Sequence, residues 1–440
     1  MADNKPIKGF SRLSTDEKIK MVVSVLDDPA AAEARLRSFH HSDRDIQNIL
    51  SSLSENTLSN FPLPFGVAPN FLINDRLYMV PMVTEESSVV AAAASAAGFW
   101  ASRGGFRVKR TGKEKGGQFH FFYRADPGAL MNAWKDASVF LRQEAASLLE
   151  NMEKRGGGLL GLDCLDRNDI MPGFFQLDAR FDTVDAMGAN FINSCLESFG
   201  ASLRIFIQKH AELDEHAFAP LMAILSNYSP DCRVRVEASC RVSDLGEQAG
   251  MDAGVFARRF VQAMKVADED VNRAVTHNKG IMNGVDSVIL ATGNDFRAVE
   301  AAAHAWAARS GKYRSLSGAG VENDIFSLWL DMPMAIGTRG GLTRLHPLAS
   351  LALDILGNPG AEQLMMVAAS AGMASNFAAL RSLVTTGIQA GHMRMHLSNI
   401  LLELKAGEEE KSLAAQWFAK NPVSFRAVQE FILSLRNNKS

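Results

Sequence analysis

Cysteine is scarce in this sequence, and the four cysteines that occur among its 440 residues form no Cys-x-x-Cys pair. Cysteines that are so few and so far apart exclude a small disulfide-stabilised fold and a zinc ribbon. We expect all four to be small core residues of a protein in a reducing cytoplasm. They are Cys164, Cys195, Cys232 and Cys240.

The sequence also lacks a surplus of charge of either sign. It has 46 basic and 49 acidic residues, for a net charge of −3. Without a basic excess or a polybasic block, neither nucleic acid nor an anionic membrane surface is an expected partner. This average does not report on a local cationic pocket, so a small phosphorylated ligand is not excluded.

Long hydrophobic runs are missing as well. The longest, residues 89–101, is rich in alanine and too short to cross a bilayer. The first 18 residues are polar, so we expect neither a signal peptide nor a membrane anchor. The composition, 47% hydrophobic and 22% charged, is that of a globular cytoplasmic protein, and the length indicates two or three domains.

The residue patterns that are present predict an α+β fold. Ser14 and Glu17 form a capping box ahead of an apolar run, which predicts a helix. More helix is expected through 30–54, a loop and a strand at 61–75, and an alanine-rich helix from Glu85 to Ser102. These segments begin a large, mostly helical domain.

A different pattern begins near residue 106. Strands, helices and turns then alternate in an order typical of a compact ferredoxin-like unit. The expected strands are 106–110, 118–125 and 173–182, with helices at 129–155 and from about Asp185. After a strand at 233–242, helices dominate again. We therefore predict a large domain (1–110 and 226–385), an inserted small domain (111–225) and a C-terminal helical flap (386–440).

Three motifs are expected to be misleading. The Gly-x-Gly-x-x-Gly pattern at 156–161 follows a helix rather than a strand, so it indicates a turn and not a dinucleotide fingerprint. His392 and His396 have a zinc-compatible spacing, but no third ligand is evident nearby, and we expect no metal. The glycine-rich segment 337–343 fits an anion cradle and a tight turn equally well.

Three other stretches combine reactive side chains with small residues. Residues 85–88 place two carboxylates and two hydroxyls at the expected start of the alanine-rich helix. Residues 276–284 place Lys279 among amides and glycines ahead of an apolar strand, and a buried lysine there would need a partner such as Asp295. Residues 185–190 offer an Asp N-cap, where a phosphate or ribose can approach a helix.

Together these stretches resemble the 3-hydroxy-3-methylglutaryl-CoA (HMG-CoA) reductases, most of all their bacterial class II branch. The resemblance covers nearly the whole chain, and the pairing of THNKGIMNG with ATGND is its most specific part. The segments that carry it are ENTLSNFPLPFGVAPNFLIN (55–74), EESSVVAAA (85–93), DAMGAN (185–190), THNKGIMNG (276–284), ATGNDFRAVEA (291–301) and GIQAGHM (387–393).

The resemblance implies an NAD(P)-dependent oxidoreductase that interconverts HMG-CoA and mevalonate plus CoA through mevaldehyde. By motif, Lys279 is the oxyanion-stabilising cation and Glu86 the general acid and base. Asp295 orients Lys279 and tunes Glu86, and Asn283 supports the same network. His392 protonates the departing CoA thiolate from a flap that closes over the substrates.

The same resemblance implies ligand-binding residues and partners. The HMG carboxylate is expected on Arg273, with Ser88, Thr276 and Asn376 nearby. Asp185, Gly188 and Asn190 are expected to hold the nicotinamide cofactor on the small domain. The family forms its site between two subunits, which implies a homodimer or a larger assembly of dimers. HMG-CoA, mevalonate and CoA are the implied ligands, with no metal, no nucleic acid and no membrane.

The choice between NADH and NADPH stays open in the sequence. Residues 144–161, where the class II branch reads the adenosine ribose, do not align cleanly. Glu150 would suit NADH, whereas Lys154 and Arg155 would suit a 2′-phosphate. Two smaller departures, Ser59 and Ser87, replace a glycine and a proline and carry no chemistry.

Two other function classes compete with the reductase. A non-catalytic acyl-CoA-binding protein would predict loss of Glu86, Lys279, Asp295 or His392, and all four are present. An acyl-CoA hydrolase or transferase would need a nucleophile beside a base, and no Gly-x-Ser-x-Gly motif occurs.

Overall fold

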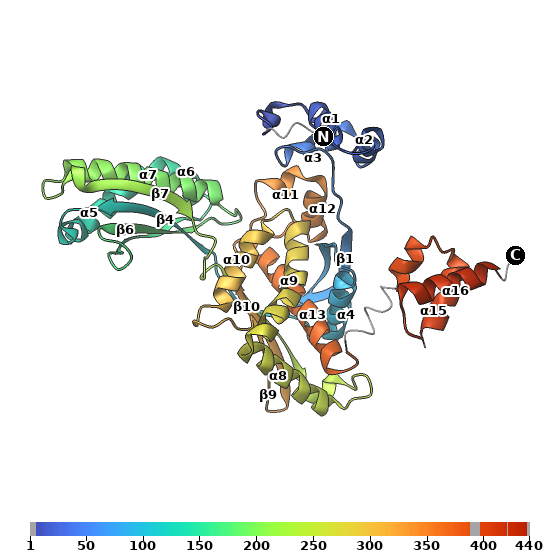
Figure 1. The fold of residues 1–440 in the computed structure, drawn as a ribbon. Coiled ribbons are helices and arrows are strands. Elements are labelled where there is room, and N and C mark those ends of the chain that lie inside the picture. Colours follow the sequence, from blue (N-terminus) through green and yellow to red (C-terminus); the bar gives the residue numbers. More distant parts are fainter. Residues whose placement is uncertain (1–5, 388–396, 420, 438–440) are drawn as a thin grey trace.

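The computed structural model describes residues 6–387, 397–419 and 421–437. Figure 1 shows a central large domain with an α/β unit extending to one side and a group of C-terminal helices on the other. Three short helices at the N-terminus lie at one end of the large domain: α1 (Thr15–Val23), α2 (Pro29–Ser38) and α3 (Arg44–Ser52). The predicted capping box is confirmed, because Ser14 and Glu17 cap each other's backbone N–H groups.

In the large domain, two sheets and a set of helices enclose one hydrophobic core. A two-stranded sheet pairs β1 with β2, and a four-stranded antiparallel sheet has the order β3-β8-β10-β9. The elements are β1 (Phe65–Ile73), β2 (Arg76–Val83), α4 (Val89–Ala101), β3 (Arg107–Thr111), β8 (Arg233–Arg241), α8 (Ala253–Glu269), α9 (Val271–Ala291), α10 (Phe296–Ala307), β9 (Ser317–Glu322), β10 (Ile325–Pro333), α11 (Leu342–Leu345), α12 (Pro347–Ile355) and α13 (Ala361–Val384).

Two tight hairpins set the strand register in this domain. Asn74 and Asp75 connect β1 to β2 with φ values of 46° and 67°. Asn323 and Asp324 connect β9 to β10 with φ values of 49° and 62°. Two consecutive left-handed residues are the requirement of a type I′ turn, and Asn and Asp tolerate that conformation better than other residues with side chains.

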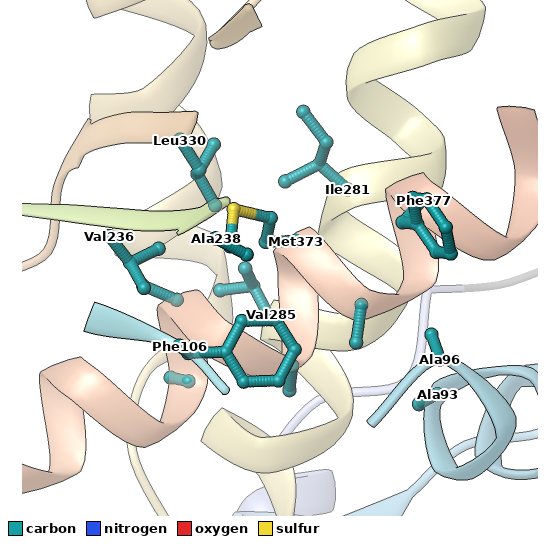
Figure 2. Packing of buried hydrophobic residues seen from close by; sticks show 14 of the residues in the cluster. Ala93, Ala96, Phe106, Val236, Ala238, Ile281, Val285, Leu330, Met373 and Phe377 are labelled. Carbon is teal, nitrogen blue, oxygen red and sulfur yellow. The ribbon is translucent and has the colours of Figure 1, made fainter. Parts of the chain in front are cut away.

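Helix α13 runs through the centre of the large domain. Its residues pack against α9, α4 and the four-stranded sheet, and most of its length is buried. Figure 2 shows Met373 of α13 between Leu330 and Ala238 of the sheet, with Ile281 and Val285 of α9 beside it. Helix α13 is long and apolar enough to cross a membrane, but its burial inside the protein is that of a core helix.

Glycine allows α9 and α13 to approach closely. A Cβ atom added at Gly284 would lie 2.3 Å from the carbonyl oxygen of Ala371, and one added at Gly372 would lie 2.5 Å from Val285 Cγ2. These distances are shorter than any normal contact. The absence of both side chains therefore fixes how near the two helix axes lie.

The small domain contains a four-stranded antiparallel sheet of order β5-β6-β4-β7, with helices between its strands. Its elements are β4 (Glu114–Tyr123), α5 (Pro127–Glu144), α6 (Ala146–Glu153), β5 (Gly158–Asp166), β6 (Phe174–Asp182), α7 (Ala189–Lys209) and β7 (Phe218–Leu225). This strand order and connectivity are those of a ferredoxin-like unit, and the predicted fold class is confirmed. Alternate residues of β4 are buried, which places Phe119, Phe121 and Tyr123 in a separate core.

The C-terminal helices have a core of their own. Residues 397–403 are helical and are followed by α15 (Glu408–Phe418) and α16 (Phe425–Asn437). Their buried residues form a cluster distinct from the large-domain core: Leu397, Ile400, Leu401, Ala406, Ala414, Phe418, Val428 and Ile432. All four cysteines of the chain are buried and unpaired, as expected.

Three details of the predicted secondary structure are wrong. The apolar segment 288–292 belongs to α9 and not to a strand, because packing against α13 overrides its β-branched composition. The single helix expected at 129–155 is two helices that meet at Ala145. Strands β2, β5, β7, β9 and β10 were not predicted, and β5 begins at Gly158, inside the segment 156–161 that was expected to be a turn.

The close contact between α9 and α13 generates a stability prediction. Gly284→Ala is expected to lower the midpoint of thermal unfolding, because overpacking a well-packed core costs about 1–3 kcal/mol. Gly280→Ala is the matched control on the same helix, since nothing lies within 4 Å of its added Cβ. The control should be neutral or stabilising by about 0.5–1 kcal/mol. Equal melting curves for both variants would contradict the close contact.

Candidate active site

Seven predicted site residues line one cavity of about 720 Å³ in the large domain. The cavity lies between the loop before α4, the first half of α9 and the second half of α13. The seven residues are Glu86, Ser88, Arg273, Thr276, Lys279, Asn283 and Asn376. Three chain segments that are far apart in sequence therefore meet at one place.

Glu86 and Ser88 lie in a loop and not in the first turn of a helix. Helix α4 begins at Val89, four residues later than the helix that was predicted to begin at Glu85. The reason is the backbone of Ser88, which has a φ of 71° and cannot continue a right-handed helix. Left-handed conformations of residues with side chains are concentrated at functional sites.

Lys279 donates a hydrogen bond from Nζ to Oε2 of Glu86. The Lys279 side chain is 60% exposed, so the prediction of a buried lysine is wrong for the single chain. Lys279 lies on the same face of α9 as Asn283, one turn earlier, and it points into an open cavity rather than into the core. The lysine and the carboxylate are nevertheless positioned as a pair.

Arg273 presents a half-buried guanidinium to the same cavity. Burial lowers its pKa, and within the described residues no carboxylate pairs with it. A partly desolvated guanidinium without a partner is suited to a carboxylate ligand, which it can bind with two parallel hydrogen bonds. This geometry fits the predicted contact with the HMG carboxylate.

A buried polar cluster that the sequence did not reveal lies behind Arg273. It consists of His277, Ser317 and Asn376, which come from α9, β9 and α13. The pKa of His277 falls to about 3, because the ring is buried and Arg273 is nearby, so the imidazole is neutral. The only sequence signal was the position of His277 within THNKG, two residues before the lysine.

A second cavity, of about 390 Å³, is lined by three of the remaining predicted residues. Gly188, Asn190 and Asp295 line it together with the glycine-rich segment 337–343. Gly188 is the N-cap of α7 and has a φ of 92°, where an added Cβ would lie 2.4 Å from Thr183. The cap offers no side-chain oxygen, so the first N–H groups of this 21-residue helix are available to an anion such as a cofactor phosphate.

Asp185 has a different position from the one predicted. It does not cap α7; its Oδ1 accepts the N–H of Ala361 at the start of α13, at 2.8 Å. Its carbonyl oxygen accepts from Thr338 and Arg339. Asp185 is therefore held against the large domain, next to the second cavity, and its predicted contact with the cofactor stays a prediction.

Buried Lys115 holds the same loop from the small-domain side. Its Nζ donates to Thr183 Oγ1 at 2.7 Å and to the Ala186 carbonyl at 2.6 Å. Burial lowers the pKa of Lys115, opposed by the nearby Asp182 and Asp185. The loop that forms one wall of the second cavity is thus attached to both domains.

Asp295 does not contact Lys279 within the chain. It is the N-cap of α10, where it accepts the N–H groups of Arg297 and Ala298 and pairs with the Arg297 side chain. Burial raises the pKa of Asp295, but these hydrogen bonds outweigh burial and hold it below its usual range. From Lys279 to the end of α9 the helix rises about 18 Å, at 1.5 Å per residue.

Comparison with known proteins assigns the chain to the same family that its sequence motifs resemble. A family model described as hydroxymethylglutaryl-coenzyme A reductase matches residues 14–397. An HMG-CoA reductase from Archaeoglobus fulgidus is 35% identical over 417 residues, which cover 92% of this chain and 88% of that protein. The chain belongs to the HMG-CoA reductase family.

Two further relatives support the membership. A probable HMG-CoA reductase from Borreliella burgdorferi is 31% identical over 90% of this chain and 87% of its own. The class II HMG-CoA reductase of Streptococcus pneumoniae, solved bound to NADPH in open conformations, has a TM-score of 0.71 and 33% identity, covering 96% of this chain and 100% of that chain.

The activity of the chain follows from its membership in the HMG-CoA reductase family. The chain is an NAD(P)-dependent oxidoreductase that interconverts HMG-CoA and mevalonate plus CoA. Neither the family nor its solved structures favour the non-redox acyl-CoA protein considered from the sequence. His392 and His396 lie outside the described residues, so the structure gives no position for the predicted thiolate acid.

The residues considered for cofactor choice lie at the C-terminal end of α6 (Ala146–Glu153): Glu150 is in the helix, Lys154 is its C-cap, and Arg155 is in the turn that follows. Met152 of this helix lines the second cavity. Glu150 and Lys154, which were weighed as alternatives, pair with each other on the exposed face at 2.6 Å. Neither is therefore free for a ribose or a phosphate without breaking that pair.

A carboxyl pair connects the helix that carries Lys279 to the helix that begins at Asp295. Asp286 of α9 faces Glu300 of α10, and within the described part of the chain its buried Oδ1 has no hydrogen-bond donor. Burial, and then the charge and hydrogen bonding of Glu300, raise the pKa of Asp286 to about 8. Near neutral pH the folded enzyme therefore retains a proton on Asp286.

This proton makes stability depend on pH. An unfolded Asp releases its proton near pH 4, so the free energy of unfolding should fall as pH rises from about 4 to about 8. Asp286→Asn removes this ionisation. The free energy of unfolding of the variant, relative to that of wild type, should therefore increase between pH 6 and pH 9 by at least about 1.4 kcal/mol, the equivalent of one pKa unit. Thermal unfolding at both pH values measures it, with Asp136→Asn as an exposed control. A constant difference between Asp286→Asn and wild type at the two pH values would contradict the raised pKa.

Proposed function

We propose that the reductase site is composite, with the first cavity of one subunit facing the second cavity of another. The observation that carries this proposal is the separation of Lys279 and Asp295 into different cavities, one beside the N-terminal and middle turns of α9 and the other beyond its C-terminal end. The first cavity has the groups for an acyl substrate, and the second has the helix terminus for a dinucleotide. A second copy of the chain would bring the halves together in a symmetric dimer.

In the first cavity, Arg273 binds the HMG carboxylate, and Ser88, Thr276 and Asn376 bind its other oxygens. The unpaired guanidinium supports this assignment. Lys279 stabilises the oxygen that becomes negative as the carbonyl is reduced, and Asn283 lies one turn away on the same face. Removing such a preorganised donor typically costs about 3–4 kcal/mol of barrier.

Glu86 supplies and removes the proton on the carbonyl oxygen. Its hydrogen bond with Lys279 places the acid and the cation at one point, so that one oxygen can contact both. Asp295 of the partner chain would join this pair and balance the charge of Lys279.

In the second cavity, Gly188 and Asn190 contact the dinucleotide at the start of α7, and Asp185 secures the loop that carries them. Two molecules of NAD(P)H, bound here one after the other, would supply one hydride each. His392, carried by a flap of residues 386–440, would protonate the CoA thiolate.

We place the large domain at 1–110 and 226–385 and the small domain at 111–225, in a cytoplasmic protein.

The reaction is tested by the absorbance of the nicotinamide with purified protein and HMG-CoA, with NADH and NADPH in parallel. Wild type should oxidise the cofactor only with HMG-CoA present, and Lys279→Ala should lose about 100-fold or more in kcat. Lys312→Ala, which breaks an exposed ion pair with Glu269, is the matched control and should be fully active. Undiminished turnover in Lys279→Ala would remove the lysine from its role.

The composite site is tested by mixing two inactive variants, Lys279→Ala and Asp295→Asn. A mixed dimer would contain one site with both residues intact, so random exchange should restore about a quarter of wild-type activity. Activity that stays at the level of the separate variants, in dimers shown by mass to have exchanged, would place both residues in a site within one chain. Mixing Lys279→Ala with Glu86→Gln should restore nothing, because both lie in the same cavity.

A further inference from the structure

The hydrogen-bond distances in the cluster of His277, Ser317 and Asn376 describe a closed ring. His277 Nε2 lies 2.7 Å from Ser317 Oγ, and Ser317 Oγ donates to Asn376 Oδ1 at 3.1 Å. Asn376 Nδ2 lies 3.2 Å from His277 Nε2 and 3.5 Å from His277 Nδ1. The side chains are 2%, 7% and 2% exposed, so the ring is closed to water.

Counting protons fixes the direction of every bond in this ring. Ser317 has one hydroxyl proton, and it goes to the Asn376 oxygen, which otherwise has no donor. The contact between His277 and Ser317 is then a donation from Nε2–H. A protonated Nε2 cannot accept from Asn376 Nδ2 despite the separation of 3.2 Å, so the lone pair of Nδ1, at 3.5 Å, is the acceptor that the ring offers to this amide. The hydroxyl of Ser315 cannot supply this proton in place of the Ser317 hydroxyl, because it donates to the Ser317 carbonyl at 2.7 Å.

This direction determines what Asn376 offers to the substrate cavity. Its oxygen is occupied by Ser317, and one of its two amide protons faces His277. The second amide proton of Asn376 remains for a ligand. Both Asn376 and His277 line the cavity beside Arg273 and Thr276. Without the ring, the carboxamide would be free to rotate by 180° and present its oxygen instead.

We propose that His277 is a positioning residue that fixes the Asn376 carboxamide with its N–H toward the acyl group. It thereby selects an acyl-CoA with a hydrogen-bond-accepting oxygen at that position. This inference rests on the proposed function of the first cavity. A site built around a fixed donor discriminates strongly against an analogue without the oxygen, because the donor would be buried unpaired.

The fold does not need His277 to hold these elements together. The neighbouring Asn278 already connects α9 to the segment before β9, since its side chain accepts from Leu316 N–H at 3.0 Å and donates to the Arg314 carbonyl at 2.9 Å. A change at His277 should therefore alter the orientation of Asn376 more than the position of Ser317.

The experiment compares His277→Leu, His277→Gln and Ser317→Ala with wild type. The amide nitrogen of Gln can take the place of Nε2 and donate to Ser317, whereas Leu cannot donate. His304→Leu is the matched control, because His304 is exposed and, within the described residues, its ring bonds the hydroxyl of Tyr313 at 2.8 Å and no other group. Each variant is measured for KM of HMG-CoA, KM of the nicotinamide cofactor, kcat, thermal unfolding, and affinity for HMG-CoA by calorimetry.

His277→Leu and Ser317→Ala should raise the KM and Kd for HMG-CoA about tenfold, the equivalent of about 1.4 kcal/mol. The KM of the cofactor should stay unchanged, and His277→Gln should recover most of the affinity. An unchanged KM and Kd in folded His277→Leu and Ser317→Ala would overturn the inference, and so would a Gln variant as impaired as the Leu variant.

The two proposals fail in different ways. Wild type that binds HMG-CoA without oxidising cofactor would contradict the proposed function, and the calorimetric comparison would still decide the role of His277. Wild type that turns over HMG-CoA, with equal affinity in all variants, would contradict only the present inference. A Leu variant with a lowered melting temperature and normal affinity would show a structural role alone.

Discussion

The packing of α9 against α13 is the constraint on which the substrate cavity depends. Helix α9 carries Arg273, His277 and Lys279, and α13 carries Asn376. The two helices approach so closely that a methyl group at Gly284 would meet the Ala371 carbonyl. Close-packed interiors transmit strain rather than absorbing it, so a shift between the helices would separate the guanidinium from the carboxamide. The geometry of the site is set by a contact in the core.

The second cavity depends on a different kind of contact. Its loop is held by Asp185, which binds the start of α13, and by Lys115, which binds Thr183 and Ala186. Both are charged groups in largely buried surroundings, where an unpaired charge is costly. The small domain is thus attached to α13, the central helix that carries Asn376 and packs against α9, and the two cavities share one support.

The sequence predicted the parts of this protein that depend on local patterns. The capping box at Ser14, the alternating strand β4 and the ferredoxin-like order are local or periodic signals, and the structure confirms them. The start of α4 was missed because it depends on the left-handed backbone of Ser88. The segment 288–292 was taken for a strand because its partner, α13, lies about 80 residues away in sequence and no local signal reports it.

The site was predicted from motifs, and motifs name residues without giving their distances. Sequence reasoning placed Glu86 with Lys279, and the structure brings them together. It also placed Asp295 there, but the length of α9 separates the two within one chain. Ser317 gave no signal because it belongs to no motif and acts only through Asn376.

The length of helix α9 also determines how the two cavities lie relative to each other. Its first half faces the substrate cavity, and its end leads into the turn at Asp295, which faces the cofactor cavity. In the proposed dimer, each α9 would therefore belong to both catalytic centres at once. One residue inserted between the two ends would rotate them by about 100° and displace them by about 1.5 Å relative to each other. Evolution can thus exchange side chains along this helix, but a change in its length would misalign both centres of the dimer together.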